Sequence, residues 1–225
     1  MSHTRPVDRS VVERPNIQEM YVVHRVFRRE LTLLPELIRG VHEGDTKRAR
    51  LVGAHLRLIL DGLHMHHTGE DEVLWPRLLD RAAPSAVLVR TMQAQHEQVD
   101  VHLDRLDPLL RTWMSTAAVL RGEQVARVTD ELRSSLLEHL DLEEREILPL
   151  VFQHITVAEW NSLGEHGRST IPARLMPVLF GSVLEDADPR EQKMMLAPLP
   201  PPVRLLLRTW GARHYSRYIR RVRGE

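Results

Sequence analysis

Four segments of the chain place apolar residues three and four positions apart, and each carries one histidine within that apolar series. Such spacing gathers residues on the face of an α-helix that packs into a core. Aromatic residues make up only 4% of the chain, and few stretches alternate as strands do. The sequence therefore predicts an all-α fold, an up-down four-helix bundle. The four series are Ile17, Met20, His24, Phe27, Leu31, Leu34 and Ile38; Val52, Leu56, Ile59, Leu63, His66, Glu70 and Leu74; Val89, Met92, His96, Val99, Leu103, Leu106 and Leu110; and Val125, Val128, Leu132, Ser135, His139, Glu143 and Ile147.

The second and fourth segments contain matching motifs. "HHTGEDEVLWP" begins at His66 and "HLDLEEREILP" begins at His139, and each closes on a proline ten positions later. Superposing the two motifs pairs the first histidine of the double "HH" with His139, and it pairs Glu70 with Glu143. Both copies therefore read His-x-x-x-Glu, a spacing that puts the two side chains on one helix face about one turn apart.

The remaining two histidines extend the repeat. His24 precedes His66 by 42 positions, and His96 precedes His139 by 43. Each half of the bundle is thus expected to be a helical hairpin with one single-histidine helix and one His-x-x-x-Glu helix. Two such hairpins packed together form a pseudo-two-fold bundle whose polar side chains meet on its axis.

These side chains have the composition of a metal centre. Burying four imidazoles and two carboxylates without a compensating cation would be costly. Six ligands exceed what one tetrahedral zinc ion takes, but they suit two metal ions, with each glutamate bridging the pair and two histidines on each ion. Mixed nitrogen and oxygen ligands fit iron, with manganese or zinc as substitutes. The predicted ligands are His24, His66, Glu70, His96, His139 and Glu143.

Nearby polar residues are expected to lie outside this ligand set. His67 has no counterpart in the second motif and is interpreted as a neighbour, although it could pair with Asp71 as a shifted copy. His55 lies about three helical turns before His66, too far to share its metal. His64 is expected to be exposed or to contact a ligand, and His102 to be structural. Two interpretations stay open for Asp71, Glu72 and Glu144: acceptors for the ligand imidazoles, or a solvated acidic face.

Composition excludes several classes of function. The 31 basic and 31 acidic residues balance, so nucleic acid is an unlikely partner. The absence of cysteine excludes disulfides, thiolate metal sites and cysteine nucleophiles. No apolar run approaches the roughly 20 residues that span a bilayer, and the first ten residues have no signal-peptide core. We therefore expect a cytoplasmic protein without an integral membrane span.

The expected domain organisation has three parts. Residues 1–15 are polar and are expected to be flexible, residues 16–152 to form the bundle, and residues 153–225 to form a helical C-terminal extension. Thr156 with Glu159 has the pattern of a capping box, and a further helix should begin at Asp188 and Pro189. The last 23 residues carry seven arginines. The favoured interpretation is a terminal helix that docks Leu205, Leu206, Trp210 and Ile219 on the core; the alternative is a basic amphipathic tail that contacts a partner or an anionic surface.

The ordered set of four histidines and two glutamates, with the flanking "EDEVLWP" and "EEREILP", resembles the hemerythrin-like proteins with an HHE cation-binding domain. The resemblance covers roughly residues 16–152. It implies a non-haem di-iron centre with two iron ions joined by an oxo or hydroxo bridge.

Two departures from the oxygen-carrying hemerythrins refine what the resemblance implies. Asp100 stands where the carriers have a second histidine on the third helix, and Glu144 stands where they have an aspartate. The pattern is closer to the branch with four histidines and two glutamates. That branch implies reaction with oxygen, peroxide or nitric oxide in stress responses, by catalase-like peroxide disproportionation or oxygen-dependent oxidation. The alternative is an iron-, redox- or oxygen-sensing module without turnover.

Overall fold

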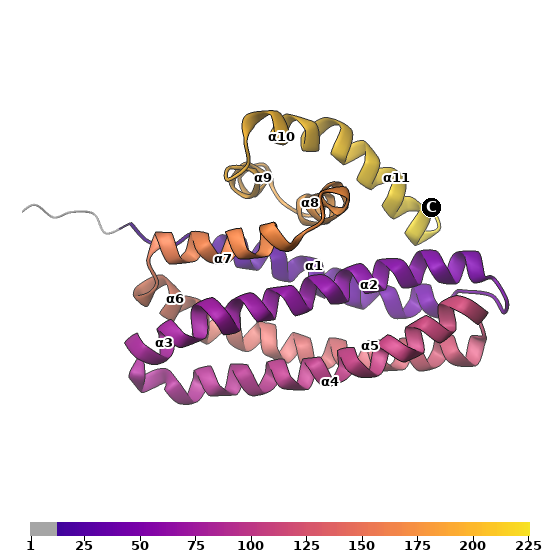
Figure 1. Cartoon of the computed structure of the whole chain (residues 1–225), viewed down its shortest axis with the longest axis horizontal. Helices are drawn as coiled ribbons and strands as arrows, with labels where there is room; N and C mark the ends of the chain where they lie inside the picture. The colour runs from indigo at the N-terminus through magenta and orange to yellow at the C-terminus, as the bar shows by residue number, and fades with distance from the viewer. Residues whose placement is uncertain (1–12) are drawn as a thin grey trace, which may run out of the picture.

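The computed structural model describes residues 13–225, apart from the side chains of residues 166–170. The expected flexible N-terminus falls largely on residues 1–12, which lie outside the described residues. Four long helices lie side by side as an antiparallel bundle: α1 Gln18–Arg39, α2 Thr46–Gly69, α4 Ala86–Thr116 and α5 Val119–Leu142 (Figure 1). Helix α1 packs on α2 and α5, and α4 packs on the same two helices. The predicted all-α four-helix bundle is confirmed.

Turn residues end the helices where the chain reverses. Gly44 adopts a φ of 76°, and the Asp45 side chain accepts a hydrogen bond from the Arg48 backbone N–H at 3.0 Å, which caps α2. At the other turn at this end, between α4 and α5, Ala117 has a φ of 50°. The Gly44 N–H donates to the Ala117 carbonyl at 3.2 Å, so the two turns are joined.

The helices that carry the His-x-x-x-Glu motifs are not continuous α-helices. A π-helical turn, η1 Glu70–Leu74, connects α2 to α3 Trp75–Arg81, and η3 Glu143–Ile147 connects α5 to α6 Leu148–His154. Each motif helix therefore changes its helical geometry within the segment that follows its glutamate. Proline follows each π turn at the second residue of the next helix, and it cannot donate the backbone hydrogen bond that would continue the α-helical ladder.

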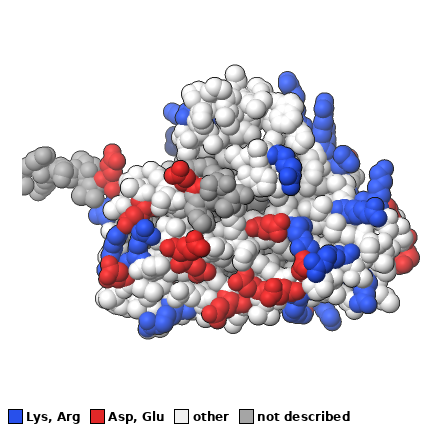
Figure 2. All heavy atoms as spheres, in the orientation of Figure 1, with Lys and Arg blue, Asp and Glu red and all other residues white. Residues whose placement is uncertain are grey.

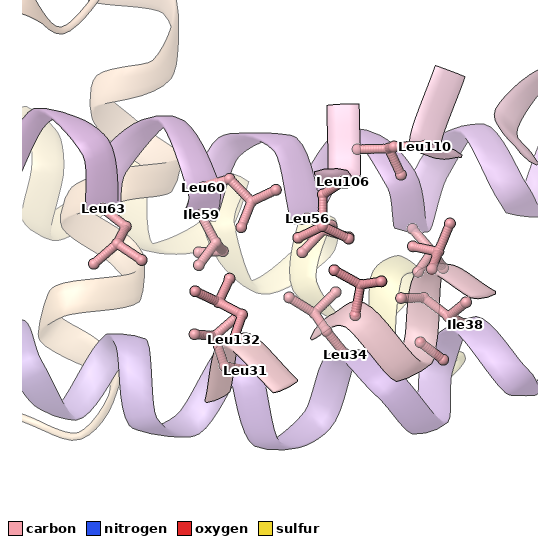
Figure 3. Packing of buried hydrophobic residues seen from close by; sticks show 14 of the residues in the cluster. Leu31, Leu34, Ile38, Leu56, Ile59, Leu60, Leu63, Leu106, Leu110 and Leu132 are labelled. Carbon is pink, nitrogen blue, oxygen red and sulfur yellow. The ribbon is translucent and has the colours of Figure 1, made fainter. Parts of the chain in front are cut away.

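Two apolar clusters fill the bundle, one on each side of the polar residues. The larger cluster is almost entirely aliphatic, and Figure 3 shows leucine and isoleucine side chains from all four long helices meeting in it. The smaller cluster includes Met20, Leu74, Trp75, Met92 and Ile147. Along every long helix the predicted ligands fall between residues of the two clusters. The polar centre is thus a layer between two apolar clusters, and five of its six predicted ligands are buried.

The C-terminal third lies on the α1 and α2 side of the bundle (Figure 1). Its elements are α7 Val157–Thr170, η4 Ala173–Leu175, α8 Met176–Glu185, α9 Pro189–Leu196, α10 Pro201–Leu206, η5 Leu207–Gly211 and α11 Ala212–Arg223. The capping box predicted at Thr156 is present, because the Glu159 N–H donates to Thr156 Oγ1 and the Thr156 N–H donates to Glu159 Oε2. A second capping box, between Asp188 and Glu191, starts α9 as expected.

The terminal helix docks on the rest of the protein, but mostly through residues that the sequence did not predict. Tyr215, Ile219 and Val222 are buried. In contrast, Leu205, Leu206 and Trp210 are each 52–65% exposed. Of the predicted contacts, only Ile219 packs. Gly181 of α8 permits the close approach of α11, since an added Cβ would lie 2.2 Å from the Tyr215 ring. In Figure 2 the basic side chains stand along α11, while acidic and basic side chains are mixed over the bundle.

A buried hydrogen-bonded network of Glu30, His55 and Tyr218 also joins the bundle to α11. His55 Nε2 lies 3.0 Å from Glu30 Oε2, and its Nδ1 lies 3.0 Å from the Tyr218 hydroxyl. Burial raises the pKa of Glu30, but His55 and Arg29 outweigh burial and lower it. His55 is therefore structural, in agreement with its expected exclusion from the metal centre. Over residues 13–225, no helix combines the length and the apolar composition required to cross a bilayer.

Candidate metal centre

All six predicted ligands meet in the polar layer, where they form two adjoining groups. The first group consists of His24, His66, Glu70 and Glu143; the second consists of His67, Glu70, His96 and His139. Within each group the candidate ligand atoms lie within 4.8 Å of one another. Because Glu70 belongs to both groups, the arrangement has the form of two neighbouring cation positions that share a carboxylate.

The carboxylates lie between histidines of different halves of the bundle. Glu70 Oε1 is 3.3 Å from His66 Nε2, and its Oε2 is 3.4 Å from His96 Nε2. Glu143 Oε2 is 3.3 Å from His24 Nε2 and 3.7 Å from His139 Nε2. Each glutamate thus faces one histidine from each hairpin, as a bridging ligand must.

Buried polar atoms without partners show that this donor set fits cations. Both carboxylate oxygens of Glu70 and of Glu143 lack a hydrogen bond, as do Nε2 of His96 and Nε2 of His139. Buried polar groups are normally satisfied, and an unpaired carboxylate in a dry interior is costly. Unprotonated imidazole nitrogen and carboxylate oxygen are also the ligands that iron, manganese and zinc accept. A pair of divalent cations would satisfy these atoms together.

The pKa values reflect the same crowding. Burial raises the pKa of Glu143 to about 8, with the Glu70 carboxylate adding to the shift. Burial lowers the pKa of His139 to about 2, so its imidazole is neutral. Burial also lowers the pKa of His96, but Asp71 and Glu70 outweigh burial and raise it to about 9. Only neutral imidazoles and ionised carboxylates bind metal, so a cation at this centre would displace protons.

Outer hydrogen bonds orient three of the imidazoles. His24 Nδ1 lies 2.8 Å from Glu144 Oε1, and His96 Nδ1 lies 3.1 Å from Asp71 Oδ1. The two acceptors directly follow Glu70 and Glu143 in the sequence, and each belongs to the opposite hairpin from its histidine. In a neutral imidazole, a proton on Nδ1 leaves Nε2 unprotonated and free to bind a metal. Asp71 and Glu144 are therefore acceptors for the ligand imidazoles, one of the two interpretations that the sequence left open.

Gln95 adds a partner that the sequence gave no reason to single out. Its Oε1 lies 3.2 Å from His139 Nδ1. The equivalent position of the first half is Val23, whose side chain cannot accept a hydrogen bond. The two halves of the centre are therefore not identical in their outer contacts.

His67, which the sequence left outside the predicted ligand set, lies beside those residues and belongs to the second candidate group. It is 3% exposed, and neither ring nitrogen has a hydrogen-bond partner. Its counterpart in the second half is Leu140, so comparing the motifs gave no sign of it. The doubled histidine of "HH" was the only available signal. Two adjacent helical residues differ in direction by about 100°, which lets His66 and His67 reach different groups.

Other histidines and acids near the centre do not join it. The His64 side chain is 63% exposed and lies 3.3 Å from the Asp100 carboxylate. Asp100 thus faces the surface instead of taking the place of the second histidine of the oxygen carriers. His102 contacts Ser135 and Arg105 on the surface of α4, in keeping with a structural role.

The π turns keep the ligand series aligned. Residues 66, 70, 74 and 78 all face inward at intervals of four, and so do residues 139, 143, 147 and 151. In an α-helix every step of four overshoots a full turn by about 40°, so a long series at this interval drifts off the face. The wider π turn cancels part of the drift, and Glu70 and Glu143, with which the two turns begin, stay in line with the apolar residues that follow.

Comparison with models of known protein families identifies the family of this chain. The hemerythrin HHE cation binding domain matches residues 16–151, which is more than half of the chain. The chain belongs to the hemerythrin family. The hemerythrin match spans α1 to α6 and includes all six predicted ligands and His67. The C-terminal helices α7 to α11 lie outside the hemerythrin match. No curated protein and no solved structure gave a significant match.

Proposed function

We propose that this hemerythrin domain holds two iron ions and reacts with oxygen or peroxide, with nitric oxide as a related small ligand. The observation that carries the proposal is the pair of adjoining ligand groups that share Glu70. Manganese or zinc would fit the same nitrogen and oxygen donors, and the iron assignment rests on the hemerythrin family together with those donors.

Each side chain of the centre would have a distinct role in metal binding. His24 and His66 would bind one ion, and His67, His96 and His139 the other. Glu70 and Glu143 would bridge the two and balance their charge. Asp71, Glu144 and Gln95 would hold protons on the outer imidazole nitrogens and thereby fix which nitrogen faces the metal. The apolar clusters on both sides exclude bulk water.

Bound iron would supply one-electron redox chemistry toward a small oxidant. The protein's contribution is to keep two ions close together in a dry layer with fixed ligands. Two adjacent iron ions could together exchange the two electrons of a peroxide-level reaction, provided that a small molecule can reach them. A peroxide-handling or oxidative-stress activity is the form of this chemistry that we propose.

A second candidate, an iron-responsive module without turnover, is supported by the unpaired buried carboxylates. Because the carboxylate oxygens of Glu70 and Glu143 are buried without hydrogen-bond partners, iron binding should stabilise the fold strongly, as in other sites whose ligands are satisfied only by metal. Iron occupancy would then control the stability of the bundle.

The test is metal analysis combined with a turnover assay. The purified chain is loaded with ferrous ion without oxygen and then exposed to air. We expect two irons per chain, near-ultraviolet charge-transfer bands and consumption of added peroxide. His139→Ala should lose all three, whereas His64→Ala, at the exposed histidine, should keep them. Far fewer than two irons would refute the di-iron proposal, and full loading without turnover would favour the sensing module.

A further inference from the structure

An apolar cavity of about 240 Å³ lies between the bundle and the C-terminal helices. Figure 1 shows α7, α8 and α9 lying over α1 and α2, and the cavity lies between these two layers and is partly open to solvent. Its walls are almost entirely aliphatic, aromatic and thioether side chains. They include Phe27, Ile59 and Met65 from the bundle and Trp160, Leu179 and Met195 from the C-terminal third.

His66 forms part of the inner wall of this cavity. Its side chain is 12% exposed, whereas those of the other five predicted ligands are at most 3% exposed. His66 Nε2 faces Glu70, but no described residue accepts a hydrogen bond from its Nδ1. In this respect His66 differs from His24, His96 and His139, whose Nδ1 atoms all have acceptors. One edge of the ring therefore remains available to a molecule in the cavity.

Gly62 of α2 also borders the cavity, and close packing does not account for it. An added Cβ would meet only the edge of the Phe27 ring, at 4.0 Å. Gly53, Gly122 and Gly181 differ, since an added Cβ at each would lie less than 3.0 Å from a neighbouring side chain. A glycine inside a helix costs about 0.5–1 kcal/mol relative to alanine. At Gly62 no close contact with a neighbouring helix offsets this cost. The effect of the glycine is to keep space open in the cavity.

We propose that the cavity binds a neutral, apolar organic molecule of about two rings, with an oxygen atom that accepts a hydrogen bond from His66. A dry cavity of roughly 150 Å³ lined by apolar side chains takes up benzene. The larger volume here therefore suits a fused two-ring compound. A neutral ligand fits because the described lining residues include no lysine or arginine for an anionic group, and they include the carboxylate of Glu19. The proposal does not depend on iron, since protein side chains alone form the cavity.

The probe is 2-naphthol, which is neutral at pH 7 and whose fluorescence is excited at wavelengths that tryptophan does not absorb. We expect saturable binding at one site per chain, both before and after iron loading, and no binding of 2-naphthalenesulfonate, which carries a charge. Gly62→Leu, which fills the cavity, should weaken 2-naphthol binding at least tenfold. Ala54→Leu, on the exposed face of the same helix, should leave it unchanged.

Three outcomes would overturn the proposal: no saturable binding to the wild-type chain, equal binding of the sulfonate, or unchanged binding by a folded Gly62→Leu variant. If Gly62→Leu loses helical signal in circular dichroism, Gly62→Ala replaces it. Its single added methyl group should cause a smaller but measurable loss of affinity, and no loss would refute the location. Binding of 2-naphthol to a chain that does not load iron would leave this proposal standing while the di-iron proposal fails.

Discussion

The imidazole of His67 stacks on that of His96, with ring centroids 3.9 Å apart and planes inclined by only 9°. The two residues come from different hairpins, on α2 and α4. A stacked pair of buried imidazoles, with no hydrogen bond to either nitrogen of His67, is an uncommon way to fill a core. A cation bound by both rings would account for it.

We therefore expect His67 to contribute to metal binding. His67→Ala and His67→Phe should both lower iron content from two toward one per chain, because neither replacement has a nitrogen ligand. Phenylalanine preserves the stacked ring and so separates ligation from packing. Metal analysis and thermal denaturation measure the two effects. Full iron loading by His67→Phe would show that the ring only packs.

The acceptors of the outer imidazole nitrogens should tune affinity without abolishing it. Glu144→Ala removes the partner of His24, and a loss of about 10- to 100-fold in iron affinity is expected. Glu146→Ala, two residues away on the exposed side, is the matched control. Affinities come from competition with a chelator of known strength. Equal effects of the two variants would mean that the Glu144 contact has no special role.

Acid should release α9 from the bundle. Arg25, the Asp188 backbone N–H and Gln18 lower the pKa of Glu191 to about 2. A lowered pKa means that the stabilisation is complete above the ordinary glutamate range and is lost as the pH falls from about 4.5 toward 2. Hydrogen exchange over α9 should therefore accelerate in this interval.

Glu191→Gln provides the comparison for the acid effect. It should lose up to about 2 kcal/mol at pH 7, a figure reduced for solvent screening, and its remaining stability should depend less on acid. Glu165→Gln, at an exposed glutamate of α7, should behave as the wild type. A Glu191→Gln variant with the same acid profile as the wild type would contradict this assignment.

Glycine substitutions should have opposite effects at two positions. Gly181→Ala would drive a Cβ into Tyr215, 2.2 Å from Cγ, and should undock α11 and lower the melting temperature. Gly62→Ala meets no close neighbour and should raise stability by about 0.5–1 kcal/mol. Thermal denaturation of both variants checks the pair. A melting temperature unchanged by Gly181→Ala would mean that α11 contributes little to the fold.

The bundle and the convergence of the six predicted ligands in one layer could be predicted from the sequence because periodicity and the internal repeat both constrain them. His24, His66, His96 and His139 stood where apolar residues were required, and a buried polar residue has few explanations. His67 could not be found in this way. The repeat compares equivalent positions, and His67 is an asymmetric addition opposite Leu140.

The other misses have different physical causes. Helical periodicity assumes a constant turn, so it cannot report a π turn. In the C-terminal third, Leu205, Leu206 and Trp210 were as apolar as the residues that pack, and the choice of face depends on tertiary contacts such as Tyr215 against Gly181. The Glu30 and His55 pair was invisible because only the fold brings α1 and α2 together.

The π turns also set a limit on engineering this chain for stability. A designer who regularised α2 through α3 would delete one residue of η1 and obtain a continuous, better hydrogen-bonded rod. Every side chain beyond the deletion would then rotate by about 100°, and Trp75 and Leu78 would leave the smaller cluster. The same holds for η3 and Val151. These two irregular turns are therefore positions where idealising the backbone would disassemble the end of the bundle that encloses the metal centre.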